Sequence, residues 1–138
     1  PQSIEKPKKA HWLDRNLLQK VLHEMPEKDI LLNISSYSET IAAPNLIDSV
    51  KLMKKIRPNL PIALASNGTV YREKVIEELI DNELDHFSFS FDAATKDDYK
   101  VLMQKDDFEK AWENLNKIVE MKNKKNSKMK ITIYFETD

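Results

Sequence analysis

His-Phe-Ser-Phe-Ser-Phe-Asp-Ala-Ala-Thr, residues 86–95, is the stretch that decides the fold. Phenylalanine alternates along it with serine and then with aspartate. Because successive side chains of a strand point to opposite faces, this strand would have one aromatic face and one face of Ser88, Ser90 and Asp92. Thr95 follows as a candidate cap for the next helix. The segment predicts a plan of apolar strand, polar exit and helix.

The same plan recurs along the chain. Strands are predicted at residues 29–36, 61–65, 86–92 and 129–135, with amphipathic helices before and between them. Strands separated by helices predict right-handed crossovers and a parallel sheet. The alternation in the third strand is also typical of a half-exposed antiparallel edge. The first strand, a nearly continuous apolar run, is predicted to be buried on both faces. We expect an α/β domain that is part of a larger barrel or sheet.

Composition excludes several classes of protein. Of 138 residues, 41% are hydrophobic and 33% charged, and 22 Lys and Arg nearly balance 23 Asp and Glu. A net charge of −1 argues against a broad nucleic-acid or membrane-binding surface. There is no cysteine, hence no disulfide or thiolate site within these residues. With no membrane-spanning run and no signal-peptide pattern, we expect a soluble, cytoplasmic protein. Gly68 is the single glycine, so Asn82 is predicted to take a left-handed helix-end position.

Polar side chains follow each predicted strand. In parallel α/β folds, ligands bind at the carboxyl ends of the strands. The four exits carry hydroxyls, an amide and carboxylates, at Ser36–Glu39, Ser66–Asn67, Ser90–Asp92 and Glu136–Asp138. This set suits hydrogen bonding to a polyol, an amine or a ribose, and suits nucleophilic chemistry poorly. Each exit alone is also compatible with ordinary turn chemistry, and Glu39 with Asp92 is compatible with an acid/base pair.

Three of these segments resemble, in order, motifs of the radical S-adenosylmethionine (SAM) superfamily. Residues 34–41, Ile-Ser-Ser-Tyr-Ser-Glu-Thr-Ile, resemble its Leu-Ser-Gly-x-Gly-Glu-Pro-Leu segment. Residues 65–69, Ala-Ser-Asn-Gly-Thr, resemble its Thr-Asn-Gly-Thr strand exit. Residues 87–95 resemble its Ser-Ile-Ser-Ile-Asp-Ala-Ala-Thr segment. The resemblance implies a partial (β/α)6 TIM-type barrel whose second to fifth strands are present, in a single truncated core domain with a loop at 1–12 and βα repeats at 13–138.

The resemblance also implies a cofactor site. Glu39 would hold the amino group of SAM, and Ser90 and Asp92 would lie beside its ribose. Further side chains of the same site would come from Ser36, Ser38, Ser66 and Asn67. A carboxylate suits an ammonium group, and hydroxyls with a carboxylate suit ribose hydroxyls, so the residue chemistry agrees with these roles.

Family chemistry requires a [4Fe-4S] cluster bound by a CxxxCxxC loop after the first strand. With that cluster and an electron donor, the complete enzyme would reductively cleave SAM to a 5′-deoxyadenosyl radical acting on an unknown substrate. A cluster needs thiolates, and this chain has none. Pro1-Gln2-Ser3 resembles the residues that follow the third family cysteine. We therefore expect the chain to begin just downstream of the cluster loop and to be inactive alone.

Four residues depart from the family pattern. Ser36 and Ser38 replace two glycines, Thr40 replaces a proline, and Met103 stands where many members have an arginine. These departures favour an alternative, in which a degenerate radical SAM-like domain is retained for binding or assembly. The other alternative is a different α/β barrel enzyme that uses Glu39 and Asp92 as acid and base, for instance on a sugar.

Overall fold

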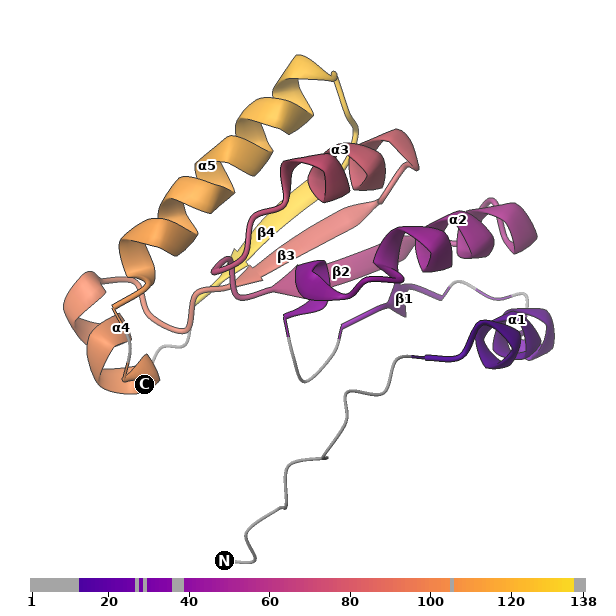
Figure 1. Cartoon of the computed structure of the whole chain (residues 1–138), viewed down its shortest axis with the longest axis horizontal. Coiled ribbons are helices and arrows are strands. Elements are labelled where there is room, and N and C mark those ends of the chain that lie inside the picture. Colours follow the sequence, from indigo (N-terminus) through magenta and orange to yellow (C-terminus); the bar gives the residue numbers. More distant parts are fainter. Residues whose placement is uncertain (1–12, 27, 29, 36–38, 105, 136–138) are drawn as a thin grey trace, which may run out of the picture.

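The computed structural model describes residues 13–26, 28, 30–35, 39–104 and 106–135. In these parts the chain alternates helices and strands as the sequence predicts (Figure 1). The elements are α1 Arg15–Glu24, β1 Leu32–Asn33, a 3₁₀ turn η1 Thr40–Ala42, α2 Leu46–Ile56, β2 Ile62–Ser66, α3 Glu73–Asp81, β3 His86–Ser90, α4 Lys96–Met103, α5 Phe108–Lys124 and β4 Lys130–Tyr134. Among the described residues, no helix is both long and apolar enough to cross a membrane.

The strands form one parallel sheet in the order β1-β2-β3-β4. The parallel prediction is confirmed, and the antiparallel alternative for residues 86–92 is wrong. Ser66 of β2 lies beside Phe89 of β3, and Ser90 lies beside Tyr134 of β4. The strands therefore share one carboxyl rim, where they end, and one amino rim, where they begin.

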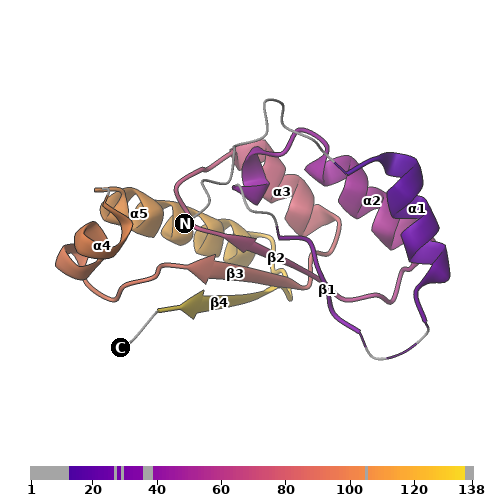
Figure 2. The ribbon, with the colours of Figure 1, turned by 90° about the horizontal axis from the view of Figure 1, so that it is seen from below.

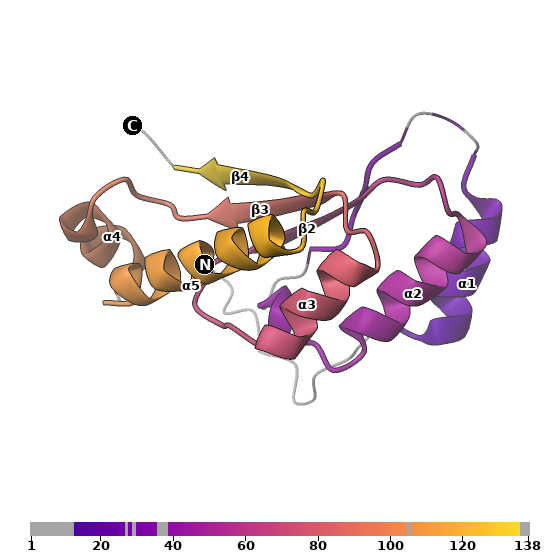
Figure 3. The same cartoon turned by 90° about the horizontal axis from the view of Figure 1, so that it is seen from above.

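The helices cover one face of the sheet. Figures 2 and 3 show α1, α2, α3 and α5 on the same side, with no described element on the other. Phe87, Phe89 and Phe91 are fully buried beneath this layer. The Phe91 ring meets Phe108 and Trp112 of α5 edge-on, at centroid distances of 5.7 and 5.6 Å. The serines of β3 are only half-buried, because they project from the uncovered face.

The first strand is shorter and more exposed than predicted. Only Leu32 and Asn33 pair regularly with β2, whereas a strand was expected over residues 29–36. Asn33 is exposed and Leu31 is 53% exposed, so the expected burial on both faces is wrong. The reason is position: β1 lies at the edge of the sheet, and the described helices cover one face alone.

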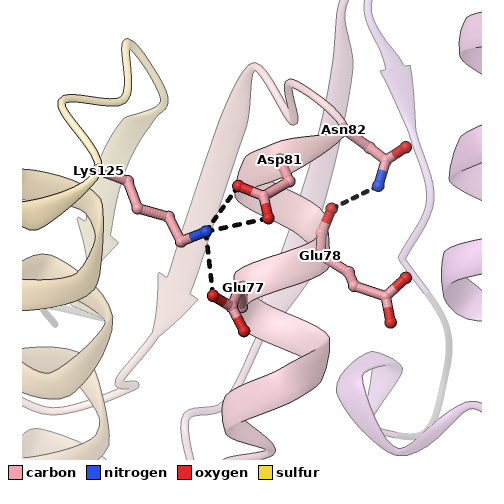
Figure 4. Close-up of polar contacts among 5 residues, drawn as sticks. All are labelled: Glu77, Glu78, Asp81, Asn82 and Lys125. Carbon is pink, nitrogen blue, oxygen red and sulfur yellow. Dashed lines mark hydrogen bonds and ion pairs between the residues drawn. The ribbon is translucent and has the colours of Figure 1, made fainter.

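The end of α3 corrects a second expectation. Asn82 has φ −92°, and Glu83 takes the left-handed conformation, at φ 57°. The Asn82 amide instead donates to the Glu78 carbonyl at 2.7 Å (Figure 4). At the same helix end, the ammonium of Lys125 contacts a carboxylate oxygen of Asp81 at 2.7 Å and joins α5 to α3.

Candidate functional site

Glu39 joins the exits of two neighbouring strands at the carboxyl rim. It follows β1 and caps η1, where its Oε1 accepts the backbone N–H of Ile41 at 3.2 Å. The same oxygen accepts the Ser66 hydroxyl at 2.7 Å, and Oε2 accepts the backbone N–H of Asn67 at 3.1 Å. The structure thus brings together Glu39, Ser66 and Asn67, three of the predicted site residues.

The Glu39 carboxylate is held by neutral donors. It is half-buried, and no lysine or arginine among the described residues forms an ion pair with it. A carboxylate offers about four acceptor positions, and the described residues fill three. Among the described residues, one acceptor position on Oε2 has no donor, and its chemistry suits a cationic donor.

The loop after β2 is fixed by its own hydrogen bonds. The Ser66 hydroxyl oxygen accepts the N–H of Gly68 at 3.0 Å, while Asn67 Oδ1 accepts the N–H and hydroxyl of Thr69 at 2.9 and 2.7 Å. Gly68 has φ 76°, and a Cβ there would lie 3.1 Å from the Phe89 ring. Glycine suits this turn because other residues rarely adopt a positive φ and would collide with that ring.

A buried asparagine on α5 supports this loop. Asn114 is 5% exposed, and its Nδ2 donates to the Gly68 carbonyl at 2.8 Å. Among the described residues the buried polar side chains are Thr40, Ser66 and Asn114. All three therefore belong to the Glu39 and Gly68 segments or contact them. Sequence reasoning missed Asn114, although an amide on the buried stripe of a helix was an available signal.

Ser90 and Asp92 lie at the same rim but outside the Glu39 network. Ser90 ends β3 on the uncovered face, and Asp92 follows with φ 58°. Burial raises the pKa of Tyr99, and the carboxylates of Asp107 and Asp92 raise that pKa further. In the described part of the chain, no hydrogen bond joins Ser90 or Asp92 to Glu39. The other two predicted site residues, Ser36 and Ser38, lie outside the described residues, as do residues 1–12 and the exit at 136–138.

The chain does not offer the ligands of an iron–sulfur cluster. It contains no cysteine, and such clusters are held chiefly by cysteine thiolates. Over the described ranges, no group of three or more His, Asp or Glu side chains is placed to hold a metal ion.

Comparison with known structures shows the same fold in larger chains. Native anSMEcpe with bound AdoMet and a Kp18Cys peptide is 20% identical, with a TM-score of 0.57; 85% of this chain and 32% of that chain are covered. Native anSMEcpe with bound AdoMet has the same identity and coverage and a TM-score of 0.59. A hexahistidine-tagged form of anSMEcpe with bound AdoMet is 18% identical, with a TM-score of 0.51 and coverage of 88% and 41%. This chain therefore spans less than half of each of these proteins.

The parallel sheet with helices on one face is part of a partial (β/α)6 TIM-type barrel, as the sequence predicts. No curated protein matches the sequence. The family model described as the radical SAM superfamily matches residues 2–138. The chain therefore belongs to the radical SAM superfamily.

Proposed function

We propose that this chain forms the SAM-binding part of a radical SAM enzyme core, with Glu39 receiving the amino group of SAM. The observation that carries the proposal is the half-buried Glu39 carboxylate, which three neutral donors hold and no described lysine or arginine neutralises. Family membership and likeness to AdoMet-bound structures support it. A hydrogen bond to a charged group contributes about 1.5–3 kcal/mol, so an ammonium at Oε2 would add substantially to affinity.

Ser66 and Asn67 would act mainly on Glu39. The Ser66 hydroxyl donates to Oε1 and accepts from Gly68, and the Asn67 side-chain oxygen accepts from Thr69. The Ser66 hydroxyl and the Asn67 side-chain oxygen therefore already have hydrogen-bond partners within the protein. In the proposed site these residues line the cavity and fix the carboxylate, whereas direct contact with the SAM amino group falls to Glu39.

Ser90 and Asp92 would receive the ribose. Both are half-buried at the carboxyl rim, and Ser90 alternates with the buried Phe89 and Phe91, so it faces away from the helix layer. A carboxylate accepts hydrogen bonds from sugar hydroxyls, and a serine hydroxyl both donates and accepts. Ser36 and Ser38 are proposed to line the same cavity, on the strength of their place beside Glu39 in the sequence.

The cluster is proposed to be bound by cysteines that precede Pro1 in the parent protein. In the complete enzyme, with an electron donor, such a cluster would supply the electron for reductive cleavage of SAM to methionine and a 5′-deoxyadenosyl radical. The residues of this chain would bind and orient SAM. The alternative use of Glu39 and Asp92 as acid and base is less well supported, because three described donors already occupy acceptor positions of the Glu39 carboxylate.

The test uses the complete protein that contains this chain, produced anaerobically with iron and sulfide. We expect cluster absorbance and reductant-dependent 5′-deoxyadenosine. A folded protein that gives neither would support the degenerate binding or assembly domain. Turnover of a glycoside without iron would support the acid/base barrel. Glu39→Gln serves as the internal comparison, since it should keep the cluster and lose 5′-deoxyadenosine formation at low SAM concentration.

A further inference from the structure

The hydrogen-bond network of Glu39 continues through the β2 exit loop into helix α5. We infer, on the basis of the role proposed for Glu39, that Asn114 is a positioning residue for SAM binding. It holds the Glu39 carboxylate in its binding orientation through Gly68 and Ser66. Asn114 itself contacts the loop, and its effect on the ligand is indirect.

Three consecutive hydrogen bonds make the connection. Asn114 Nδ2 donates to the Gly68 carbonyl at 2.8 Å, the Gly68 N–H donates to Ser66 Oγ at 3.0 Å, and Ser66 Oγ donates to Glu39 Oε1 at 2.7 Å. Because Ser66 Oγ accepts from Gly68, its single proton is directed to Glu39. The position of the Gly68 peptide thereby sets the direction of the bond that Glu39 receives.

The place of Asn114 on α5 is unfavourable unless its amide is used. It lies on the buried stripe of Ala111, Leu115 and Ile118 and is 5% exposed. Burying an amide is costly unless it is hydrogen-bonded, and a leucine would fill a stripe position without that cost. The donor bond to Gly68, 46 residues away in sequence, is what the amide adds here.

Helix α5 also holds Gly68 by direct packing. A Cβ on Gly68 would lie 3.2 Å from the Ala111 methyl group and 3.1 Å from the Phe89 ring. Ala111 is one helical turn before Asn114, so a single face of α5 both packs against Gly68 and binds its carbonyl. The β2 exit loop is thus held against α5 in two ways, by packing against Ala111 and by the hydrogen bond from Asn114 to the Gly68 carbonyl.

The test compares two ligands in the complete, cluster-loaded protein by anaerobic equilibrium dialysis. SAM carries the methionine amino group, whereas 5′-methylthioadenosine keeps the adenosine and a neutral thioether sulfur and lacks the whole amino-acid chain. For Asn114→Leu, we expect SAM affinity to fall about 3- to 10-fold, the value of one hydrogen bond, with methylthioadenosine affinity unchanged. The control Ile118→Ala, on the same buried stripe, should lower thermal stability and leave the ratio of the two affinities as in the wild type. Equal weakening of both ligands by Asn114→Leu would show a general structural role and overturn the inference.

A double-variant cycle tests the route through Glu39. In a Glu39→Gln background, Asn114→Leu should weaken SAM binding no further, because the group it positions has been neutralised. Additive losses would overturn the inference. Asn114→Asp provides a second variant of nearly the same shape. It should weaken SAM binding at neutral pH and recover relative to wild type as pH falls, since a protonated carboxyl can again donate to Gly68; no recovery would contradict a donor role.

The outcomes separate this inference from the proposed function. A wild-type protein that binds methylthioadenosine as tightly as SAM would overturn both. A wild-type protein that binds SAM more tightly, with Asn114→Leu unchanged in affinity, would overturn the role of Asn114 alone.

Discussion

The two ends of β2 each place one carboxylate against the sheet, and the two carboxylates differ in how they are satisfied. At the carboxyl rim, Glu39 accepts the N–H of Asn67, just after the strand. At the amino rim, Asp85 Oδ2 accepts the N–H of Ile62, the first residue of the strand, at 2.8 Å. Asp85 also receives the ammonium of Lys54 at 2.8 Å, whereas the described donors to Glu39 are all neutral.

Under the proposed function, this difference separates a structural carboxylate, Asp85, from the carboxylate proposed to bind a ligand, Glu39. The Asp85 carbonyl accepts the N–H of Lys130, so this residue joins the starts of β2, β3 and β4, and Lys54 already neutralises its charge. A cavity of about 890 Å³ lies at this amino rim, but the Asp85 and Lys125 charges lining it are paired within the protein. Two of the charges at this cavity thus have partners within the protein, whereas the described donors to Glu39 are neutral.

Gly68→Ala should have the largest effect on stability, and the structural change should be confined to the β2 exit loop at the carboxyl rim. A positive φ and contacts of 3.1–3.2 Å with Phe89 and Ala111 predict a loss of about 2–4 kcal/mol in the free energy of unfolding. Denaturant titration measures it. Glu83→Gly, at an exposed position with φ 57°, is the matched control and should cause no comparable loss. A Gly68→Ala variant as stable as wild type would mean that the β2 exit loop is not held as described.

Asp85→Asn should lower the free energy of unfolding and leave the affinity for SAM unchanged. Lys54, whose side chain is 17% exposed, would lose its counter-ion. The free energy of unfolding should fall by about 1–2 kcal/mol, less than for a fully buried ion pair, because the Asp85 side chain is 43% exposed. Adding Lys54→Met should recover part of it by removing the unpaired charge. Chemical denaturation measures the stability, and equilibrium dialysis measures the SAM affinity. A fall in SAM affinity with Asp85→Asn would contradict the proposal that Asp85 is structural and only the carboxyl rim binds the ligand.

Thr95→Ala tests a part of the carboxyl rim outside the Glu39 network. The Thr95 hydroxyl oxygen accepts the N–H of Asp98 at 3.2 Å and caps α4. Losing this cap should cost about 1 kcal/mol in thermal or chemical unfolding. Asp107→Ala is the comparison, because Asp107 occupies the same position of α5 without a capping bond and should cost less. Equal losses from the two variants would contradict the capping role of Thr95.

The smallest effect is expected at the exposed pair Lys51 and Glu78, which is remote from both rim carboxylates in the hydrogen-bond network. The hydrogen bond from Lys51 lowers the pKa of Glu78. The Glu78 carboxyl group therefore binds a proton more readily in the unfolded state than in the folded state. The pair stabilises the fold at pH values above the ordinary carboxyl pKa, and this stabilisation is lost as pH falls through the lowered pKa of the folded state. Lys51→Met should return the Glu78 pKa toward its ordinary value, which NMR titration follows, with a loss of stability at neutral pH smaller than in the other variants. A Glu78 pKa that stays low would mean that Lys51 is not its cause.

Much of this arrangement could be predicted from local sequence. The alternation in β3 defined its two faces, and helices between strands defined the parallel order, which in turn placed Ser66 and Asn67 beside Glu39. The length of β1 could not be predicted, because its apolar residues gave no sign that it lies at an edge. Asn114 escaped prediction because its partner Gly68 is 46 residues away and meets it only after α5 packs on the sheet.

The most direct test of the central claim measures the affinities of SAM and 5′-methylthioadenosine for Glu39→Gln and Asp85→Asn in the complete, cluster-loaded protein. Glu39→Gln removes the charge proposed to meet the ammonium group, so SAM affinity should fall about 10- to 100-fold, the value of a charge-assisted hydrogen bond. Methylthioadenosine affinity should not change, and Asp85→Asn should alter neither. Unchanged SAM affinity in Glu39→Gln, or equal losses for both ligands, would contradict the role of Glu39 as the receptor of the SAM amino group.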